Sequence, residues 1–139
     1  MKVGRLVGVV CLTTVAASLP GCESPAAPVT STVITEMHQG TLESSGEADV
    51  YPFTVGEMGT VNVILISTFQ PATSLAVAVG IAVGTWDGTE CTLLVKNDNA
   101  TLSTAISGQA LPGEYCVSVY DVGHVGDNPV NYSVEIRHL

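Results

Sequence analysis

The stretch VNYSVEIR, residues 130–137, decides the fold of this chain of 139 residues. Apolar side chains alternate with polar ones from Val130 to Arg137, which is the pattern of a half-buried β-strand. The same alternation occurs at Tyr51, Phe53 and Val55. A helix would instead repeat its apolar side chains about every 3.6 residues. We therefore expect a sheet with one buried face.

Further strand-like stretches occur before and between these two. They occur at 33–42, 60–68, 75–83, 91–95, 102–107 and 114–122. Turns rich in Gly, Pro, Asn and Asp separate the stretches, notably at 56–59, 84–88, 97–99 and 123–129. Seven or eight short strands, with no helical window of any length, predict an all-β fold and an antiparallel β-sandwich.

Two residues mark special positions in these strands. Pro52 has no backbone N–H to donate, which predicts that the strand around Tyr51 lies at the edge of a sheet or begins irregularly. Gly40 interrupts the first stretch, which predicts a bulge or a bend there.

The N-terminus has the layout of a secretory signal. Lys2 and Arg5 precede an uncharged, apolar run over 6–19. This run is shorter than the about 20 residues that a membrane-spanning helix needs, although a signal anchor remains the alternative. The small residues at 16–18 would also suit an ordinary cleavage site.

The sequence LPGC at 19–22 resembles the lipobox of bacterial lipoproteins. The resemblance implies a signal peptide over 1–21, cleavage before Cys22 and acylation of that residue, which would anchor the protein stably in a membrane. Glu23 follows, rather than the aspartate that retains some lipoproteins at the inner membrane, so we expect the outer membrane of a bacterial cell envelope. Residues 22–32, rich in Pro, Ser, Thr and Ala, then read as a solvated tether.

The folded domain, residues 33–139, is strongly acidic. All 13 Asp and Glu follow Cys22, and only Lys96 and Arg137 oppose them, which gives the chain after residue 21 a net charge of −11 with His neutral. Such a surface excludes nucleic acid as a partner, because phosphate binding needs a basic face.

The cysteines predict one disulfide bond. Cys11 leaves with the signal peptide and Cys22 takes the lipid, so Cys91 and Cys116 remain as a pair in an oxidising compartment. A metal site at this pair lacks further ligands at useful spacing.

Several motifs follow one another in the order found in a known family. They are GTL at 40–42, ADVYPFTV at 48–55, GTVNV at 59–63, LPGEYCVSVY at 111–120 and NYSVEI at 131–136. Together they resemble bacterial pre-peptidase C-terminal domains. The resemblance implies a jelly-roll-like β-sandwich over 33–139, of a kind appended to secreted enzymes for binding, secretion or stability. Because no enzyme accompanies it here, we expect a free-standing, non-catalytic binding or accessory module.

Two candidate sites carry oxygen or aromatic groups. Trp86 and Asp87 lie in a Gly-flanked segment and are the candidates for binding a carbohydrate or protein ligand, unless Trp86 is buried at the end of the sandwich. We expect no cofactor. The candidates for a calcium site, which some members of the resembled family have, are Asp98, Asp121, Asp127 and Asn128.

Two alternatives to a binding module stay open. A hydrolase could use the loop that holds His124 and Asp127, although no recognised catalytic motif surrounds them. A structural protein could assemble by pairing the edge strand around Tyr51 with another chain.

Overall fold

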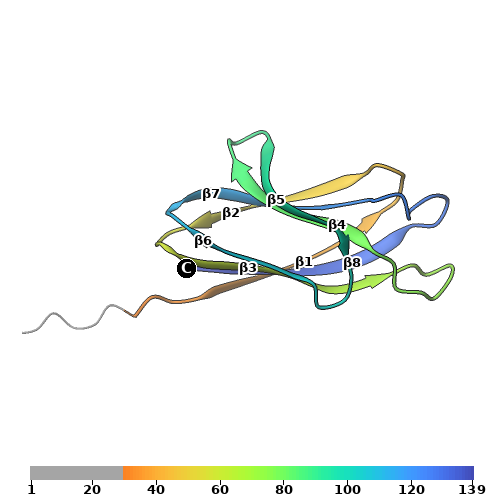
Figure 1. Cartoon of the computed structure of the whole chain (residues 1–139), viewed down its shortest axis with the longest axis horizontal. Coiled ribbons are helices and arrows are strands. Elements are labelled where there is room, and N and C mark those ends of the chain that lie inside the picture. Colours follow the sequence, from red (N-terminus) through yellow and green to blue (C-terminus); the bar gives the residue numbers. More distant parts are fainter. Residues whose placement is uncertain (1–29) are drawn as a thin grey trace, which may run out of the picture.

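Eight strands build the domain in the computed structural model, which describes residues 30–139 (Figure 1). In chain order they are β1 Ile34–Leu42, β2 Ala48–Val55, β3 Gly59–Phe69, β4 Val79–Trp86, β5 Cys91–Ala100, β6 Ala105–Ala110, β7 Gly113–Tyr120 and β8 Val130–His138. They form two antiparallel sheets, sheet A in the order β1-β8-β3-β6 and sheet B in the order β2-β7-β4-β5. The predicted all-β sandwich is confirmed.

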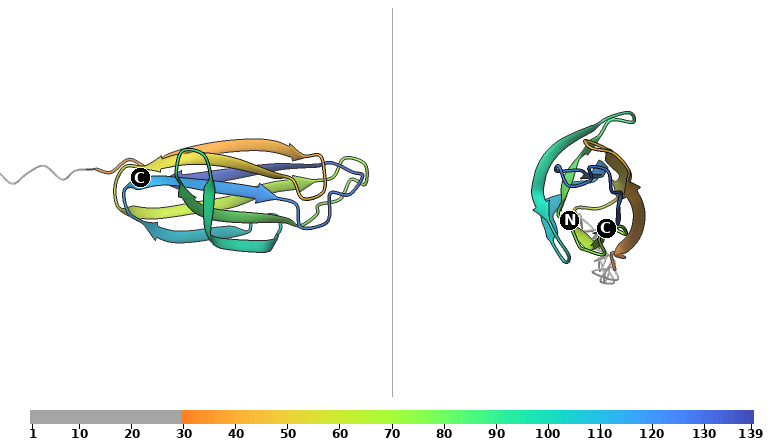
Figure 2. Two further views of the ribbon diagram at one scale, coloured as in Figure 1. Left: turned by 90° about the horizontal axis from the view of Figure 1, so that it is seen from above. Right: turned by 90° about the vertical axis from the view of Figure 1, so that its right-hand side faces the viewer.

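The pairing of the strands is that of a jelly roll. β1 pairs with β8, β2 with β7, β3 with β6 and β4 with β5, as in a long antiparallel hairpin that has been rolled up. β3 also pairs with β8, and β4 with β7, which completes the two sheets. Figure 2 shows the two sheets wrapped around a common core.

The core lies between the inner faces of the two sheets. The four apolar side chains of the 130–137 stretch are at most 3 % exposed, whereas Asn131 and Arg137 are exposed. Phe53 and Val55 are buried as well, and Tyr51 is half-buried against the core. The alternation in the sequence therefore assigned the buried face of both stretches correctly.

Several strand boundaries differ from the sequence-based expectation. The strand expected at 75–83 begins at Val79 and continues to Trp86, so residues 84–86 are not a connection. Residues 97–99 are not a turn but part of β5, and β6 covers 105–110 rather than 102–107. The polar end of β5 fits a strand because β5 lies at an edge of sheet B, where its side chains face solvent.

The structure confirms the edge strand predicted at Pro52 but not the bulge predicted at Gly40. Pro52 lies in β2, which is an edge strand of sheet B as predicted. Gly40 is not at a bulge, because the register between β1 and β8 is continuous. A side chain at Gly40 would collide with the hydroxyl of Tyr132 and with the carboxylate of Asp49, so glycine makes room for these two groups.

The described chain enters and leaves the sandwich at the same end (Figure 2). The hydroxyl of Ser31 donates to the Glu57 carboxylate over 2.5 Å, and the N–H of Gly56 donates to the carbonyl of Leu139 over 2.9 Å. The predicted signal peptide (1–21), the predicted lipid site at Cys22 and the tether up to residue 29 lie outside the described residues. Within residues 30–139, no helical segment has the length and apolar character that a membrane crossing requires.

Candidate functional site

The two sides of the sandwich, where the edge strands of sheets A and B face each other, are built from different residues. On one side β1 faces β2, and we call it the closed side. On the other β6 faces β5, and we call it the open side.

Aromatic and polar groups fill the closed side. The ring of His38 on β1 stacks on Tyr51 of β2, with 4.4 Å between the ring centroids. The hydroxyl of Tyr132 donates to the Asp49 carboxylate over 2.5 Å, and the Tyr51 hydroxyl lies 2.5 Å from that of Tyr132. Burial raises the pKa of Tyr132, and its hydrogen bonds to Asp49 and Tyr51 raise it further. Tyr132 is therefore a neutral, buried connection between the two sheets.

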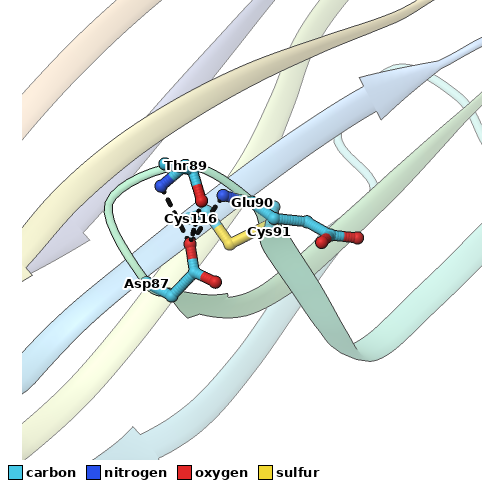
Figure 3. The surroundings of a disulfide bond; sticks show 5 residues. All are labelled: Asp87, Thr89, Glu90, Cys91 and Cys116. Carbon is cyan, nitrogen blue, oxygen red and sulfur yellow. Dashed lines mark hydrogen bonds between the residues drawn. A yellow bond between two sulfur atoms is a disulfide. The ribbon is translucent and has the colours of Figure 1, made fainter.

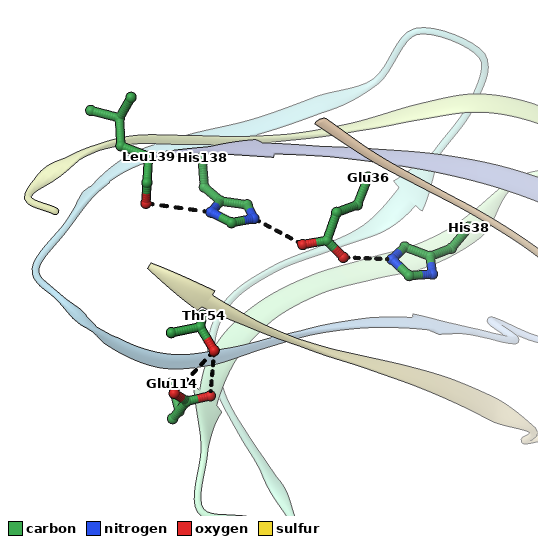
Figure 4. Close-up of polar contacts among 6 residues, drawn as sticks. All are labelled: Glu36, His38, Thr54, Glu114, His138 and Leu139. Atoms are coloured by element: carbon green, nitrogen blue, oxygen red, sulfur yellow. Dashed lines mark hydrogen bonds and ion pairs between the residues drawn. The ribbon is translucent and has the colours of Figure 1, made fainter. Parts of the chain in front are cut away.

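Glu36 joins two histidines on the same side (Figure 4). Its Oε1 lies 2.9 Å from Nε2 of His138, and its Oε2 lies 3.3 Å from Nε2 of His38. The buried ring of His138 also packs on Phe53, with the ring centroids 5.1 Å apart. Nearby, the Thr54 hydroxyl donates to both oxygens of Glu114 and ties β2 to β7. The polar groups of the closed side are thus satisfied by one another.

An apolar groove of about 120 Å³ lies on the open side. Seven apolar or aromatic side chains from both sheets line it: Val61, Val83, Leu94, Val95, Ile106, Ala110 and Tyr115. Gly108 of β6 also faces the groove, and a Cβ added there would have no atom within 4 Å. For comparison, an apolar cavity of about 150 Å³ holds a benzene molecule. The groove therefore has room for one large apolar side chain.

β5 forms the rim of this groove and is largely exposed. Leu93, Leu94 and Val95 are 45 %, 63 % and 55 % exposed. In the part of the chain that the structure describes, β5 pairs with β4 and its other edge pairs with no strand. Proteins usually blunt such an edge, and Lys96, which forms an ion pair with Asp98 over 2.8 Å, does so only in part. An apolar strand edge beside an apolar groove is a typical binding surface for an extended polypeptide.

Gly84 of β4 leaves room for the backbone of β5. The register between β4 and β5 shifts between Val83 and Gly84, which marks a β-bulge. A Cβ at Gly84 would collide with the carbonyl of Thr92, so the backbone of β5 passes directly over this glycine.

A disulfide bond fixes the first residue of β5 (Figure 3). It joins Cys91 to Cys116 on β7, with 5.9 Å between the Cα atoms, and so spans the strand that separates β5 from β7. The predicted pairing of Cys91 with Cys116 is confirmed. A disulfide is typical of proteins outside the cytoplasm, which agrees with an extracytoplasmic location.

Trp86 and Asp87, the predicted ligand-binding pair, lie next to this disulfide and do not line the groove. Trp86 ends β4 and is half-buried, outside the main core cluster. The Asp87 carboxylate accepts hydrogen bonds from the N–H groups of Glu90 and Thr89, over 2.7 and 2.8 Å, and from the Thr89 hydroxyl. These bonds lower the pKa of Asp87. The carboxylate shapes the turn that leads into Cys91.

Asp98, one of the calcium candidates, contacts two neighbouring side chains of sheet B. It pairs with Lys96 and accepts a hydrogen bond from the Tyr120 hydroxyl, and both contacts lower its pKa. Burial and the bond to Asp98 raise the pKa of Tyr120 to about 12.

Asp121, another calcium candidate, holds loops together. Its carboxylate accepts hydrogen bonds from four N–H groups, those of Gly46, Gly123, His124 and Val125. Burial acts to raise its pKa, but these four donors outweigh burial and lower it. Its role in the described structure is to join the loop after β1 to the loop before β8.

The remaining predicted residues lie in the loop before β8. Asp127 is exposed, and the carbonyl of Asn128 accepts from the Gln70 amide over 2.9 Å. Within residues 30–139, no group of three or more His, Cys, Asp or Glu is arranged to hold a metal ion. The ring of His124 is exposed, while its backbone N–H and carbonyl bind Asp121 and Gln70.

Sequence reasoning did not find the groove. The strand at 91–95 was expected, but not the exposure of three consecutive apolar residues at 93–95. A signal was present, because an unbroken apolar run cannot place all of its side chains on one buried face of a sheet.

Comparison with solved structures finds several structural likenesses. The chain is similar to the solved pre-peptidase C-terminal domain of a collagenase from Bacillus anthracis, with a TM-score of 0.49 and 16 % sequence identity, over 74 % of this chain and 87 % of that one. No protein-family model matches the chain, and neither does any curated protein. A likeness at this level says nothing about ligands.

Proposed function

We propose that this chain is a lipid-anchored protein of the bacterial cell envelope whose sandwich is a non-catalytic module that binds an extended polypeptide segment along β5. The observation that carries this proposal is the open side, where an unpaired strand edge with exposed Leu93, Leu94 and Val95 adjoins the apolar groove.

Strand addition accounts for both parts of this surface. An extended segment that pairs with β5 gains main-chain hydrogen bonds, and the groove accepts one of its side chains. The groove walls are mostly apolar, with Ser107 and Gln109 as the polar residues, so the anchoring side chain is a large apolar one. Its burial would also cover Leu94 and Val95.

Charge selects the chemistry of the partner. Of the chain's 13 acidic residues only Glu23 precedes residue 30, which leaves twelve on the described domain against Lys96 and Arg137. Asp87 and Glu90 lie in the turn directly before β5. The partner is therefore a segment with alternating apolar and basic residues, because its charges attract those of the domain. A second copy of this acidic chain is repelled.

The position of the groove is compatible with an anchor at the N-terminus. Residues 30–33 join the domain at the end where Ser31 contacts Glu57, whereas the groove runs along a side of the sandwich. A tether at that end leaves the open side accessible. The lipid anchor itself is inferred from LPGC at 19–22 and tested separately below.

The binding test uses the full-length protein, purified in detergent, on an array of synthetic peptides. The array varies the spacing of apolar residues and the net charge. We expect binding to extended peptides with alternating apolar and basic residues, and weak binding to acidic peptides of the same apolar pattern.

Two variants locate the contact. Gly108→Val places a branched side chain in the groove without collision at Cβ, and Leu94→Asp places a charge on its rim. Each should reduce binding at least tenfold. The control is Leu75→Asp, an equally exposed leucine in the loop between β3 and β4, which should bind as the unaltered protein does. Unchanged binding by Gly108→Val would rule out the groove, and concentration-dependent self-association would favour structural assembly instead.

The anchor is tested by Cys22→Ser in a bacterial host. We expect the variant to leave the membrane fraction, while the unaltered protein stays there and carries an acylated N-terminal cysteine by mass spectrometry. Retention of Cys22→Ser with an intact N-terminus would indicate a signal anchor.

A further inference from the structure

A second surface, independent of the groove, lies on the outer face of sheet A. It is an open hollow of about 430 Å³ over β1, β8 and β3. Six side chains of the three strands line it: Gln39, Thr41, Ser67, Phe69, Asn131 and Ser133. All six are uncharged. The volume is in the range of ordinary ligand sites, about 300–1,000 Å³.

The register places these side chains in two rows across the sheet. Ser133 lies opposite Gln39 on one side and Ser67 on the other. Asn131 lies opposite Thr41 and Phe69 in the next row. The Thr41 hydroxyl donates to Oδ1 of Asn131 over 2.8 Å, which leaves the NH₂ group of Asn131 free to donate outward.

A β-bulge turns Phe69 toward this hollow. Val61, Val63 and Leu65 of β3 point into the core, and simple alternation would send Phe69 there too. The register between β3 and β8 shifts between Leu65 and Ser67, so Thr68 is buried instead and Phe69 is exposed by 43 %. Bulges often re-aim a side chain next to a functional site. The effect here is an exposed aromatic ring on a polar face.

Ser133 supplies an unused hydrogen-bonding group in the hollow. The residue is 7 % exposed, and its hydroxyl has no hydrogen-bond partner within the described residues. A buried hydroxyl without a partner is unfavourable, and native proteins keep few of them. Its position among the lining residues suggests that a bound ligand satisfies it.

We propose that this hollow binds a neutral saccharide. Uncharged amide and hydroxyl groups match the hydroxyls of a sugar, and an exposed aromatic ring offers the apolar surface on which a sugar ring lies. The acidic domain repels anionic glycans, and the absence of a charged group from the lining gives no partner for cationic ones. The site shares no residue with the groove, so either proposal can fail without the other.

The test is affinity electrophoresis of the full-length protein through gels that contain a soluble neutral polysaccharide. The panel is a β-glucan, a mannan, a dextran and a xylan, with polygalacturonate as the anionic comparison. We expect retardation by at least one neutral polymer and none by polygalacturonate. Retardation by polygalacturonate alone, or by no polymer, would overturn the proposal.

Three variants assign the binding to the hollow. Phe69→Ala and Asn131→Ala should each weaken retardation about tenfold, whereas the control Leu111→Ala, an exposed leucine outside the hollow, should not. Ser133→Ala separates binding from folding, because removing an unpartnered hydroxyl should leave the thermal midpoint unchanged or raise it while binding weakens. Full retardation of all three variants would place the saccharide elsewhere and contradict the proposal.

Discussion

The closed and open sides of the sandwich differ in what fills the space between their two edge strands. Each must cover the gap between two edge strands. On the closed side, Tyr132, Tyr51 and Asp49 fill the gap with hydrogen-bonded aromatic rings. On the open side, Leu94 and Val95 face solvent around a groove. One side therefore contributes to stability, while the other leaves apolar surface exposed, and the proposed polypeptide partner would cover that surface.

Replacing one residue on each side by alanine should give the largest difference in the free energy of unfolding. Tyr132→Ala removes a buried ring and leaves Asp49 without its donor, so we expect a loss of about 3–5 kcal/mol. Leu94→Ala removes an exposed side chain and should change stability by less than about 0.5 kcal/mol. Urea denaturation measures both. Equal losses would show that the groove residues are part of the stabilising core.

The disulfide should matter next, because it fixes the start of the exposed strand. Replacing Cys91 and Cys116 by serine opens a loop with a sequence separation of 25 residues, for which we expect a loss of about 3 kcal/mol. Hydrogen exchange should also quicken more in β5, which carries Cys91, than in β2, which carries neither cysteine. Faster exchange in both edge strands alike would contradict a local role.

Adding a single methyl group at one glycine on each side should also affect stability differently. Gly40→Ala on the closed side collides with Tyr132 and Asp49, so we expect a loss of about 1–3 kcal/mol. Gly108→Ala on the open side meets open space, and stability should stay the same or rise by up to about 1 kcal/mol. Thermal midpoints of the two variants test this. A loss for Gly108→Ala would mean that the groove is filled.

Alkaline pH should weaken the closed side. The folded protein holds Tyr132 neutral with a raised pKa, whereas the unfolded chain releases the proton near about pH 10. The stabilisation is complete below that pH and is lost as pH rises above it, by at most about 1.4 kcal/mol per pH unit. Unfolding measured between pH 9 and about 11 should show this slope in the unaltered protein and in Leu94→Ala, but a shallower one in Tyr132→Phe. Identical slopes in all three would exclude Tyr132 as the cause.

The sequence was sufficient for the fold because alternation and turn residues are local signals. VNYSVEIR and the stretch at 51–55 became buried strands with the expected faces, and Pro52 correctly indicated an edge. Gly40 and Gly84 were misread because each makes room for another strand, Gly40 for the side chain of Tyr132 on β8 and Gly84 for the backbone of Thr92 on β5. Such contacts between strands leave no pattern in the residues that flank the glycine.

The candidate sites were less predictable for the same reason. The disulfide followed from counting cysteines, but the groove depends on two edge strands from different sheets. The outward turn of Phe69 depends on a bulge that the sequence of β3 does not announce. Trp86 and Asp87 were predicted to bind a ligand because an aromatic residue lies beside an acid. The Asp87 carboxylate instead accepts hydrogen bonds from the backbone of the turn before Cys91.

Hydrogen exchange on the full-length protein, with and without a peptide that the array selects, tests the central claim most directly. In the free protein, the amides of the exposed edge of β5 should exchange quickly. With peptide bound, the amides between Leu93 and Asp98 should be protected, while those of β2 and of the outer face of sheet A stay unchanged. Protection that falls on β2, or that leaves β5 as fast as before, would contradict the assignment of the open side as the binding surface.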